Sequence, residues 1–167
     1  DSQAQFDRWQ GTKSDDSTIV RKILAQHHFQ VMAVQKLHEA GVNIVCGTDA
    51  GIGVTPAGYT IHQELQFYKD AGMNNYEALK TATLNAASIH DFLGDMGSIQ
   101  VGKRANFNLS KQNPLVNLQT LRKPNVVFVN GLMLKRATLD EYEIKAKNRS
   151  NLIVSGLRYA ENLLVEK

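Results

Sequence analysis

Apolar and polar residues follow a helical period in the first part of the chain. Apolar positions recur at steps of three and four, which is the pattern of one face of an amphipathic helix. This stripe consists of Ile19, Ile23, Leu24, His27, Val31, Val34 and Leu37. Side-chain oxygens of Asp15, Asp16 and Ser17 can cap the start of the helix, and Gly41 is suited to end it.

A different pattern follows at residues 42–46 (VNIVC), which are mostly apolar and lie between Gly41 and Gly47. A short run of this kind predicts a strand that is buried on both faces, as in a parallel sheet. The order of helix, glycine and buried strand is typical of an alternating α/β fold. The strand leads into a glycine-rich loop, residues 47–58, which contains a single carboxylate, Asp49.

Two further helical segments are predicted after this loop. Thr60 and Gln63 resemble a capping box at the start of the first segment. Asn74 and Glu77 repeat this start signal ahead of an alanine-rich stretch that runs toward Gly94. We therefore expect helices on both sides of residue 72.

Beyond Gly94 the apolar residues recur with a period of two, which is the pattern of β-strands. Residues 97–99 and 105–109 are predicted as strands around a turn, and residues 126–134 as a β-hairpin. The hairpin turn is Asn130-Gly131, a dipeptide that is favoured because type I′ turns need positive φ at both central residues. From Leu139 onward the apolar spacing returns to that of a helix.

Composition narrows the class of protein. The 167 residues contain 19 Lys and Arg and 16 Asp and Glu, and the resulting net charge of +3 is too small to indicate nucleic-acid binding or membrane attraction. No apolar run reaches the roughly 20 residues of a membrane helix. Cys46 is the one cysteine, so no internal disulfide can form. No leader is visible and the cytoplasm is favoured, although a chain that starts at Asp1 is expected to be a piece of a longer one.

Asp49 is the strongest candidate for chemistry. It lies just past the predicted buried strand, and in barrels and open α/β sheets the carboxyl ends of the strands face the ligand. A carboxylate at that place can bind a divalent metal and accept the proton of an attacking water. On pattern alone, capping of the following turn explains Asp49 equally well.

Other residues carry weaker signals. His62 lies in the first turns of the helix after the loop, where it could contact substrate. Cys46 lies in the apolar segment, where a thiol is usually inert. The loop glycines do not have the G-x-G-x-x-G spacing, so a nucleotide-binding half-domain has little support. The remaining histidines are expected to pack or to face solvent: His27, His28, His38 and His90.

Four blocks of the chain together resemble the C-terminal part of metal-dependent amidohydrolases, in particular the imidazolonepropionase-like and prolidase-like branch. The blocks are AGVNIVCGTDAG (40–51), HQELQFYKDAGMNNYEALKTATLNAAS (62–88), LGDMGSIQVGKRANFNLSKQNPL (93–115) and VVFVNGLML (126–134). Because four blocks occur in the order and spacing of the family, the resemblance is more specific than the GTDAG segment alone.

The resemblance implies an α/β fold, namely the C-terminal fragment of a TIM barrel together with strands of a small β-sandwich. Residues 1–93 would hold the last barrel strand with its loop and helices, residues 94–136 the sandwich strands, and residues 137–167 a C-terminal helix. It further implies a hydrolase that cleaves C–N bonds in amides, dipeptides or cyclic amides with one or two divalent ions, with zinc expected first. Asp49 matches the family aspartate that binds metal and shuttles the proton.

Two departures from the family pattern qualify this expectation. Asn106 and Phe107 stand where the family usually has Asp-Leu, a position in the sandwich. The family's His-x-His, its lysine and its barrel histidines have no counterparts in the 167 residues. We therefore expect this chain alone to be inactive, to hold no stoichiometric metal, and to associate with itself or with the rest of its barrel. The alternative is a non-catalytic structural or binding module related to the same C-terminus.

Overall fold

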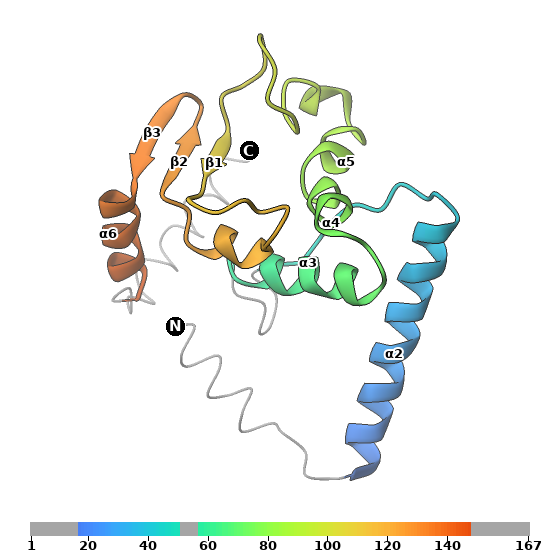
Figure 1. Ribbon diagram of the computed structural model, residues 1–167. Coiled ribbons are helices and arrows are strands. Elements are labelled where there is room, and N and C mark those ends of the chain that lie inside the picture. The colour runs from blue at the N-terminus through green and yellow to red at the C-terminus, as the bar shows by residue number, and fades with distance from the viewer. Residues whose placement is uncertain (1–16, 51–56, 148–167) are drawn as a thin grey trace, which may run out of the picture.

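A computed structural model describes residues 17–50 and 57–147 (Figure 1). It contains helices and one antiparallel sheet, so the expected mixture of helix and strand is confirmed. The predicted caps Asp15 and Asp16 lie outside the described residues. The helical elements are α2 (Ser17–Glu39), α3 (Thr60–Asp70), α4 (Asn75–Thr81), α5 (Leu84–Ala87), η1 (Asp91–Leu93), η2 (Leu118–Arg122) and α6 (Arg136–Lys147), where η marks a 3-10 helix. The strands are β1 (Phe107–Leu109), β2 (Val126–Val129) and β3 (Leu132–Lys135).

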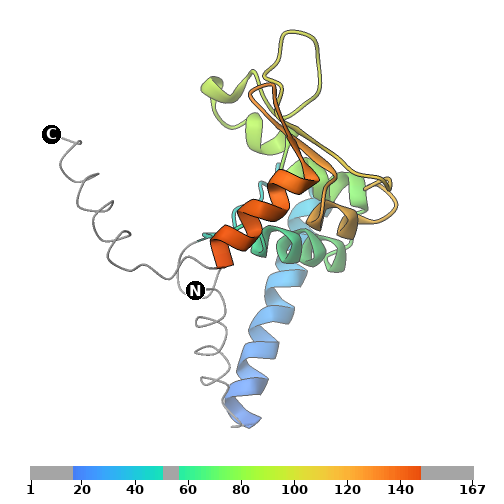
Figure 2. The ribbon, with the colours of Figure 1, turned by 90° about the vertical axis from the view of Figure 1, so that its left-hand side faces the viewer.

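Helix α2 confirms the helix predicted from the apolar stripe. It meets the other helices through Val34, which packs against the core, and through the ring of His27, which lies 5.1 Å from that of Phe67. Toward its N-terminus it leads away from the rest of the coloured ribbon in both views (Figures 1 and 2). None of its residues is buried within the described part of the chain, and Ile23 and Leu24 are each 60% exposed. The apolar stripe of α2 is therefore largely uncovered.

The hydrophobic core lies between α3, α4 and η2. Its buried members are Leu65, Tyr68, Met73, Ala78 and Leu118. Element η2 follows β1 in the sequence, yet its Leu118 packs with the helices and not with the sheet. The core therefore joins segments from both sides of residue 94.

Helix α4 begins with the predicted capping box. The side chain of Asn74 accepts from the Glu77 N–H at 3.0 Å, and the Glu77 carboxylate accepts from the Asn74 N–H at 2.8 Å. Two backbone donors at the start of the helix are satisfied in this way.

The capping box predicted at Thr60 and Gln63 is wrong. Helix α3 starts at Thr60, so the N-cap residue is Tyr59, whose side chain makes no cap hydrogen bond. A phenol lacks the short side-chain oxygen that capping requires. Sequence spacing placed the helix correctly but assigned its cap one residue too late.

The alanine-rich stretch is divided into α4 and α5 by a break at residues 82–83. Threonine hydroxyls near the break bond back to the helix: Thr81 Oγ1 donates to the Ala78 carbonyl and Thr83 Oγ1 to the Leu79 carbonyl, both at 2.7 Å. Such bonds to a carbonyl three or four residues earlier compete with regular helix geometry and bend the chain.

Residues 42–46, predicted as a buried strand, are not a strand in this structure. A strand needs a ladder partner, and the sheet formed by the described residues consists of β1, β2 and β3 alone. The segment lies instead against the helices: Ile44 and Cys46 pack on the core, and Asn85 Nδ2 donates to the Ile44 carbonyl at 2.9 Å. The apolar pattern thus predicted the contact with the core but not the backbone pairing.

The sheet has the order β1-β2-β3, and β2 and β3 form the predicted hairpin. Asn130 and Gly131 have φ values of 50° and 81°, as the expected type I′ turn requires. Phe107 of β1 pairs with Phe128 of β2, and their rings stack with centroids 4.4 Å apart. Residues 97–99, also predicted as a strand, form none. Helix α6 follows β3 directly and starts at Arg136, three residues before the expected position.

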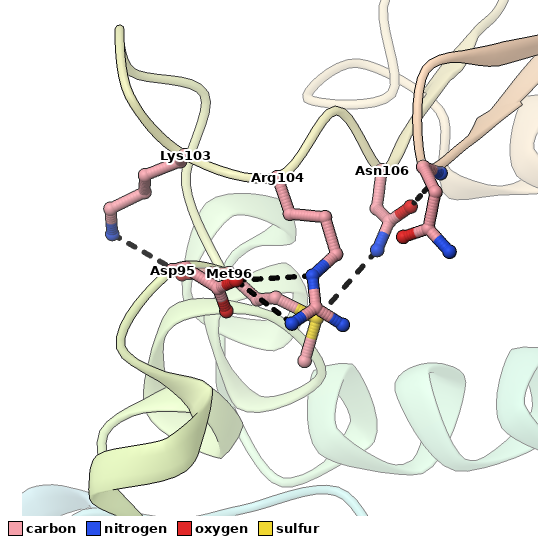
Figure 3. Close-up of polar contacts among 6 residues, drawn as sticks. Asp95, Met96, Lys103, Arg104 and Asn106 are labelled. Atoms are coloured by element: carbon pink, nitrogen blue, oxygen red, sulfur yellow. Dashed lines mark hydrogen bonds and ion pairs between the residues drawn. The ribbon is translucent and has the colours of Figure 1, made fainter.

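Polar contacts close the loop between η1 and β1 (Figure 3). The Asp95 carboxylate accepts from Nε and Nη2 of Arg104 at 3.1 and 2.8 Å, and Lys103 Nζ donates to the Met96 carbonyl at 3.2 Å. The two ends of the loop are therefore held together by charged side chains.

Asn106 links this loop to the hairpin. Its Nδ2 donates to Met96 Sδ at 3.6 Å, and its Oδ1 accepts from the Asn130 N–H at 2.6 Å. The aspartate that resembling sequences carry here could accept from Asn130 but could not donate to Met96. The departure at Asn106 therefore adds a contact to Met96 in the loop that precedes β1.

Candidate functional site

Asp49 lies at the end of the apolar segment, where the backbone turns sharply. Its φ is 46°, in the left-handed region, and its side chain is exposed. Asp is among the few residues other than glycine that adopt this conformation, which is otherwise unfavourable for an L-residue. A non-glycine residue held in a strained backbone conformation motivates a functional hypothesis.

Two of the three residues before Thr48 donate a backbone hydrogen bond to a helix: the Cys46 N–H to the Thr81 carbonyl at 3.0 Å, and the Gly47 N–H to Glu64 Oε1 at 2.9 Å. The Val45 carbonyl lies 3.5 Å from Tyr68 Oη, whose one proton is donated to Glu64. Helices α3 and α4 thereby fix the direction from which the chain enters the Asp49 turn.

Glu64 and Cys46, which are half-buried, and Tyr68, which is buried, form a polar cluster next to Gly47. The Tyr68 hydroxyl donates to the same Glu64 oxygen that accepts from Gly47. Burial, followed by the nearby Glu64 carboxylate, raises the pKa of the Cys46 thiol to about 12. Burial and the hydrogen bond to Glu64 also raise the pKa of Tyr68. Near neutral pH both groups therefore keep their protons, and Cys46 is a weak nucleophile, as its apolar context predicts.

His62 lies on another side of α3. It is two residues from Glu64, so the two side chains leave the helix about 200° apart. Burial, followed by the charge of Arg122 in η2, lowers the pKa of His62. Arg122 itself lies over the ring of Tyr59, 5.4 Å from its centroid. His62 therefore lies on the side of α3 that faces η2. Glu64 lies on the side that faces the segment leading to Asp49.

The remaining histidines make packing or surface contacts. His27 meets Phe67, His90 stacks on Phe92 with centroids 5.0 Å apart, and His38 Nε2 lies 3.6 Å from Glu77 Oε2. His28 is exposed on α2.

A cavity of about 270 Å³ lies at the start of the apolar segment. It is lined by His38, Gly41, Val42, Asn43, Ile44, Met73, Glu77, Lys80, Thr81 and Asn85. Asp49 is not among these residues, so the cavity and the candidate carboxylate lie at opposite ends of residues 42–49.

Metal binding can be assessed from the donors present. Within residues 17–50 and 57–147, no three His, Cys, Asp or Glu side chains are grouped to hold a metal ion. The exposed carboxylate of Asp49 has the chemistry of one oxygen ligand, and a zinc centre needs three or four. The described residues thus fit one ligand position of such a centre.

Two residues of the site were missed by sequence reasoning. Neither Glu64 nor Tyr68 was singled out as a functional residue. The available signal was their i, i+4 spacing in the helix that follows the glycine-rich loop, because side chains four apart share a helix face. Among residues 17–50 and 57–147, no helix has both the length and the apolar character needed to span a membrane.

Two solved structures similar to this chain are named as peptidases. A Xaa-Pro dipeptidase with methionine bound in its active site is 31% identical with a TM-score of 0.57, over 63% of this chain and 25% of that one. A protein from Bifidobacterium longum assigned as a prolidase is 35% identical with a TM-score of 0.59, over 66% of this chain and 30% of that one.

Sequence comparison identifies the family. The model of the amidohydrolase family matches residues 22–134, more than half of the chain, and the chain therefore belongs to this family. It is 31% identical over 103 residues to an imidazolonepropionase from Fusobacterium nucleatum subsp. nucleatum, which covers 56% of this chain and 24% of that protein. The resemblance predicted from the four sequence blocks is confirmed. The chain spans about a quarter to under a third of the length of these relatives.

Proposed function

We propose that this chain is the C-terminal part of a metal-dependent hydrolase that cleaves C–N bonds in small amides, dipeptides or cyclic amides. The observation that carries the proposal is the backbone conformation of Asp49 in a member of the amidohydrolase family. Asp49 has a left-handed φ, and hydrogen bonds to α3 and α4 hold the residues that precede it. The dipeptidase and the imidazolonepropionase among its relatives support C–N bonds as the substrate class.

Asp49 has two roles in this proposal. The Asp49 carboxylate would be one ligand of a divalent cation, with zinc expected first, together with ligands from outside the described residues. A cation of this kind would supply a water molecule whose pKa is lowered toward neutrality. The Asp49 carboxylate would also accept a proton from the water that adds to the carbonyl carbon and return it to the amine as the C–N bond breaks, which is general acid–base catalysis by one group. His62 is retained as a candidate substrate contact.

The architecture in this proposal is a TIM-barrel fragment with sandwich strands, divided at residues 93 and 136. Residues 42–46 lie in the barrel wall of the complete enzyme, and the uncovered stripe of α2 contacts the rest of the barrel or a second copy. Its support is the exposure of apolar residues on α2. The 167 residues alone are expected to be inactive. The cytoplasm is the proposed compartment, in keeping with one free, half-buried cysteine.

A non-catalytic module remains the second candidate, because the described donors supply one ligand position. Assays of the full-length gene product with Xaa-Pro dipeptides, N-acyl amino acids and cyclic amides distinguish the two. We expect Asp49→Asn to lower kcat by roughly a thousandfold, since a positioned acid–base group contributes about that much. The control Asp91→Asn, also at an exposed position, should stay within about twofold.

Metal analysis of the same preparations tests the metal-binding role of Asp49. The full-length product should contain bound divalent metal, and Asp49→Asn should reduce its content or its affinity. Two zinc ions bound to the 167-residue chain by itself would contradict the proposed division of ligands. Undiminished hydrolysis by Asp49→Asn would contradict the role of Asp49.

A further inference from the structure

We infer that Glu64 is a positioning residue, whose carboxylate holds the Gly47 N–H and so sets the turn that carries Asp49. This inference rests on the proposed function of Asp49. Glu64 has no contact with reacting atoms in this view, and it acts through the backbone.

The first line of support is the position of the hydrogen bond between Gly47 and Glu64. Gly47 is two residues before Asp49, and its N–H points to Glu64 Oε1 at 2.9 Å. The contact joins residues 17 positions apart, so it ties the turn to the middle of α3. The Cys46 N–H is tied to the Thr81 carbonyl of α4 in the same way. Glu64 supplies the bond nearest to Asp49 in this series.

The second line is the need for a restraint. Asp49 has a φ of 46°, and a single non-glycine residue in the left-handed region costs about 1–2 kcal/mol. Such a conformation persists only where surrounding contacts determine it. Gly47 has φ outside the left-handed region and open space around its Cα, so its own packing offers little restraint. A hydrogen bond from Gly47 to a charged acceptor is stronger than one to a neutral acceptor.

The third line is the state of the other groups in the cluster. The raised pKa values of Cys46 and Tyr68 keep both as neutral hydrogen-bond donors near pH 7. The Tyr68 proton is directed to Glu64, and Tyr68 is buried in the core at 7% exposure. Tyr68 of the core and Gly47 of the segment that leads to Asp49 therefore donate to the same oxygen of the Glu64 carboxylate. The geometry makes Glu64 a connection between the core and the catalytic turn.

Two substitutions distinguish the effect of side-chain length from the effect of charge. Glu64→Asp keeps the charge but shortens the side chain by one methylene, so the hydrogen bond from the Gly47 N–H should be lost. Glu64→Gln removes the charge but keeps an oxygen at the same reach, so the bond should be retained in weaker form. Gln63→Ala, an exposed neighbour on α3, is the matched control.

The readouts are hydrogen–deuterium exchange of the Gly47 amide and steady-state kinetics of the full-length gene product. In Glu64→Asp we expect Gly47 to exchange at least tenfold faster and kcat to fall by about tenfold to a hundredfold, because misplacement by about 1 Å can cost that much. The KM should stay within about twofold. Glu64→Gln should restore kcat and exchange to within about threefold of the wild type.

Four results would overturn either the inference or the proposed function. Unchanged Gly47 exchange in Glu64→Asp overturns the inference, whether or not a substrate has been found. Equal loss of kcat in Glu64→Gln and Glu64→Asp also overturns it, since the charge itself would then be needed. If Asp49→Asn is inactive while Glu64→Asp has wild-type kinetics, the inference fails and the proposed function stands. If Asp49→Asn is fully active, the proposed function fails first.

Discussion

The core between α3, α4 and η2 and the sheet of β1, β2 and β3 are held together by different interactions. The core encloses apolar side chains such as Leu65 at 4% and Ala78 at 0% exposure. The strands contain only half-buried and exposed residues, and Leu132 of β3 is 65% exposed. What fixes the sheet is its backbone ladder, the Asn130-Gly131 turn and the side-chain bonds of Asn106. Hydrogen bonding can thus define an element whose faces remain uncovered.

The difference shows which parts of the chain depend on neighbours. A hairpin forms from local signals, because its ladder partner is a few residues away. Residues 42–46 have similar apolar character but no ladder partner among the described residues. Stability is expected to be unevenly distributed as a result, and apolar burial should contribute far more in the helical core than in the sheet.

The largest expected effect is a cavity in the helical core. Leu65→Ala should lower the free energy of unfolding by about 2–5 kcal/mol, the range for a buried leucine. Leu132→Ala on the sheet should change it by less than about 0.5 kcal/mol, because the side chain is already mostly exposed. Urea denaturation of both variants of the 167-residue chain measures this contrast. Equal losses would show that the sheet is covered in solution, by self-association or otherwise.

A smaller effect is expected where the sheet region meets α5. A Cβ at Gly97 would lie 2.5 Å from Ala87 Cβ and 2.9 Å from the Thr83 carbonyl, with φ at 81°. Gly97→Ala should therefore cost about 2–4 kcal/mol from overpacking and backbone strain together. Gly102 has a similar φ of 88° and open space around it, so Gly102→Ala should show the strain of about 1–2 kcal/mol by itself. Similar melting temperatures for the two variants would contradict close packing of Gly97 on α5.

Sequence patterns predicted the elements that carry local signals. The apolar stripe gave α2, the Asn74–Glu77 pair gave the capping box of α4, and Asn130-Gly131 gave the hairpin turn. Each of these depends on residues within a few positions. The α3 cap was misplaced by one residue because Tyr59, a poor capping residue, precedes the helix.

The site was only partly predictable. Asp49 was identified from its place after an apolar segment, which is a local pattern. The bond from Gly47 to Glu64 joins positions 17 apart and depends on how α3 packs against residues 45–47, which spacing alone does not give. His62 was chosen for its closeness to the loop in sequence, yet helix geometry turns it about 200° from Glu64. Backbone pairing of residues 42–46 depends on partners that no local pattern supplies.

The smallest expected effect concerns His62, where η2 crosses α3. Burial and Arg122 lower its pKa, so the folded state resists protonation that the unfolded chain accepts near pH 6.5. The unfolded state then binds more protons, and stability is lost as the pH falls from about 6.5 toward the lowered folded value. Because His62 is only half-buried, solvent screening limits this loss to a few tenths of a kcal/mol. His62→Gln should remove that acid sensitivity, whereas His28→Gln on the exposed face of α2 should leave it in place. Urea denaturation at pH 7.5 and 5.5 compares them, and an unchanged pH dependence in His62→Gln would show that His62 is not the group that causes the loss of stability in acid.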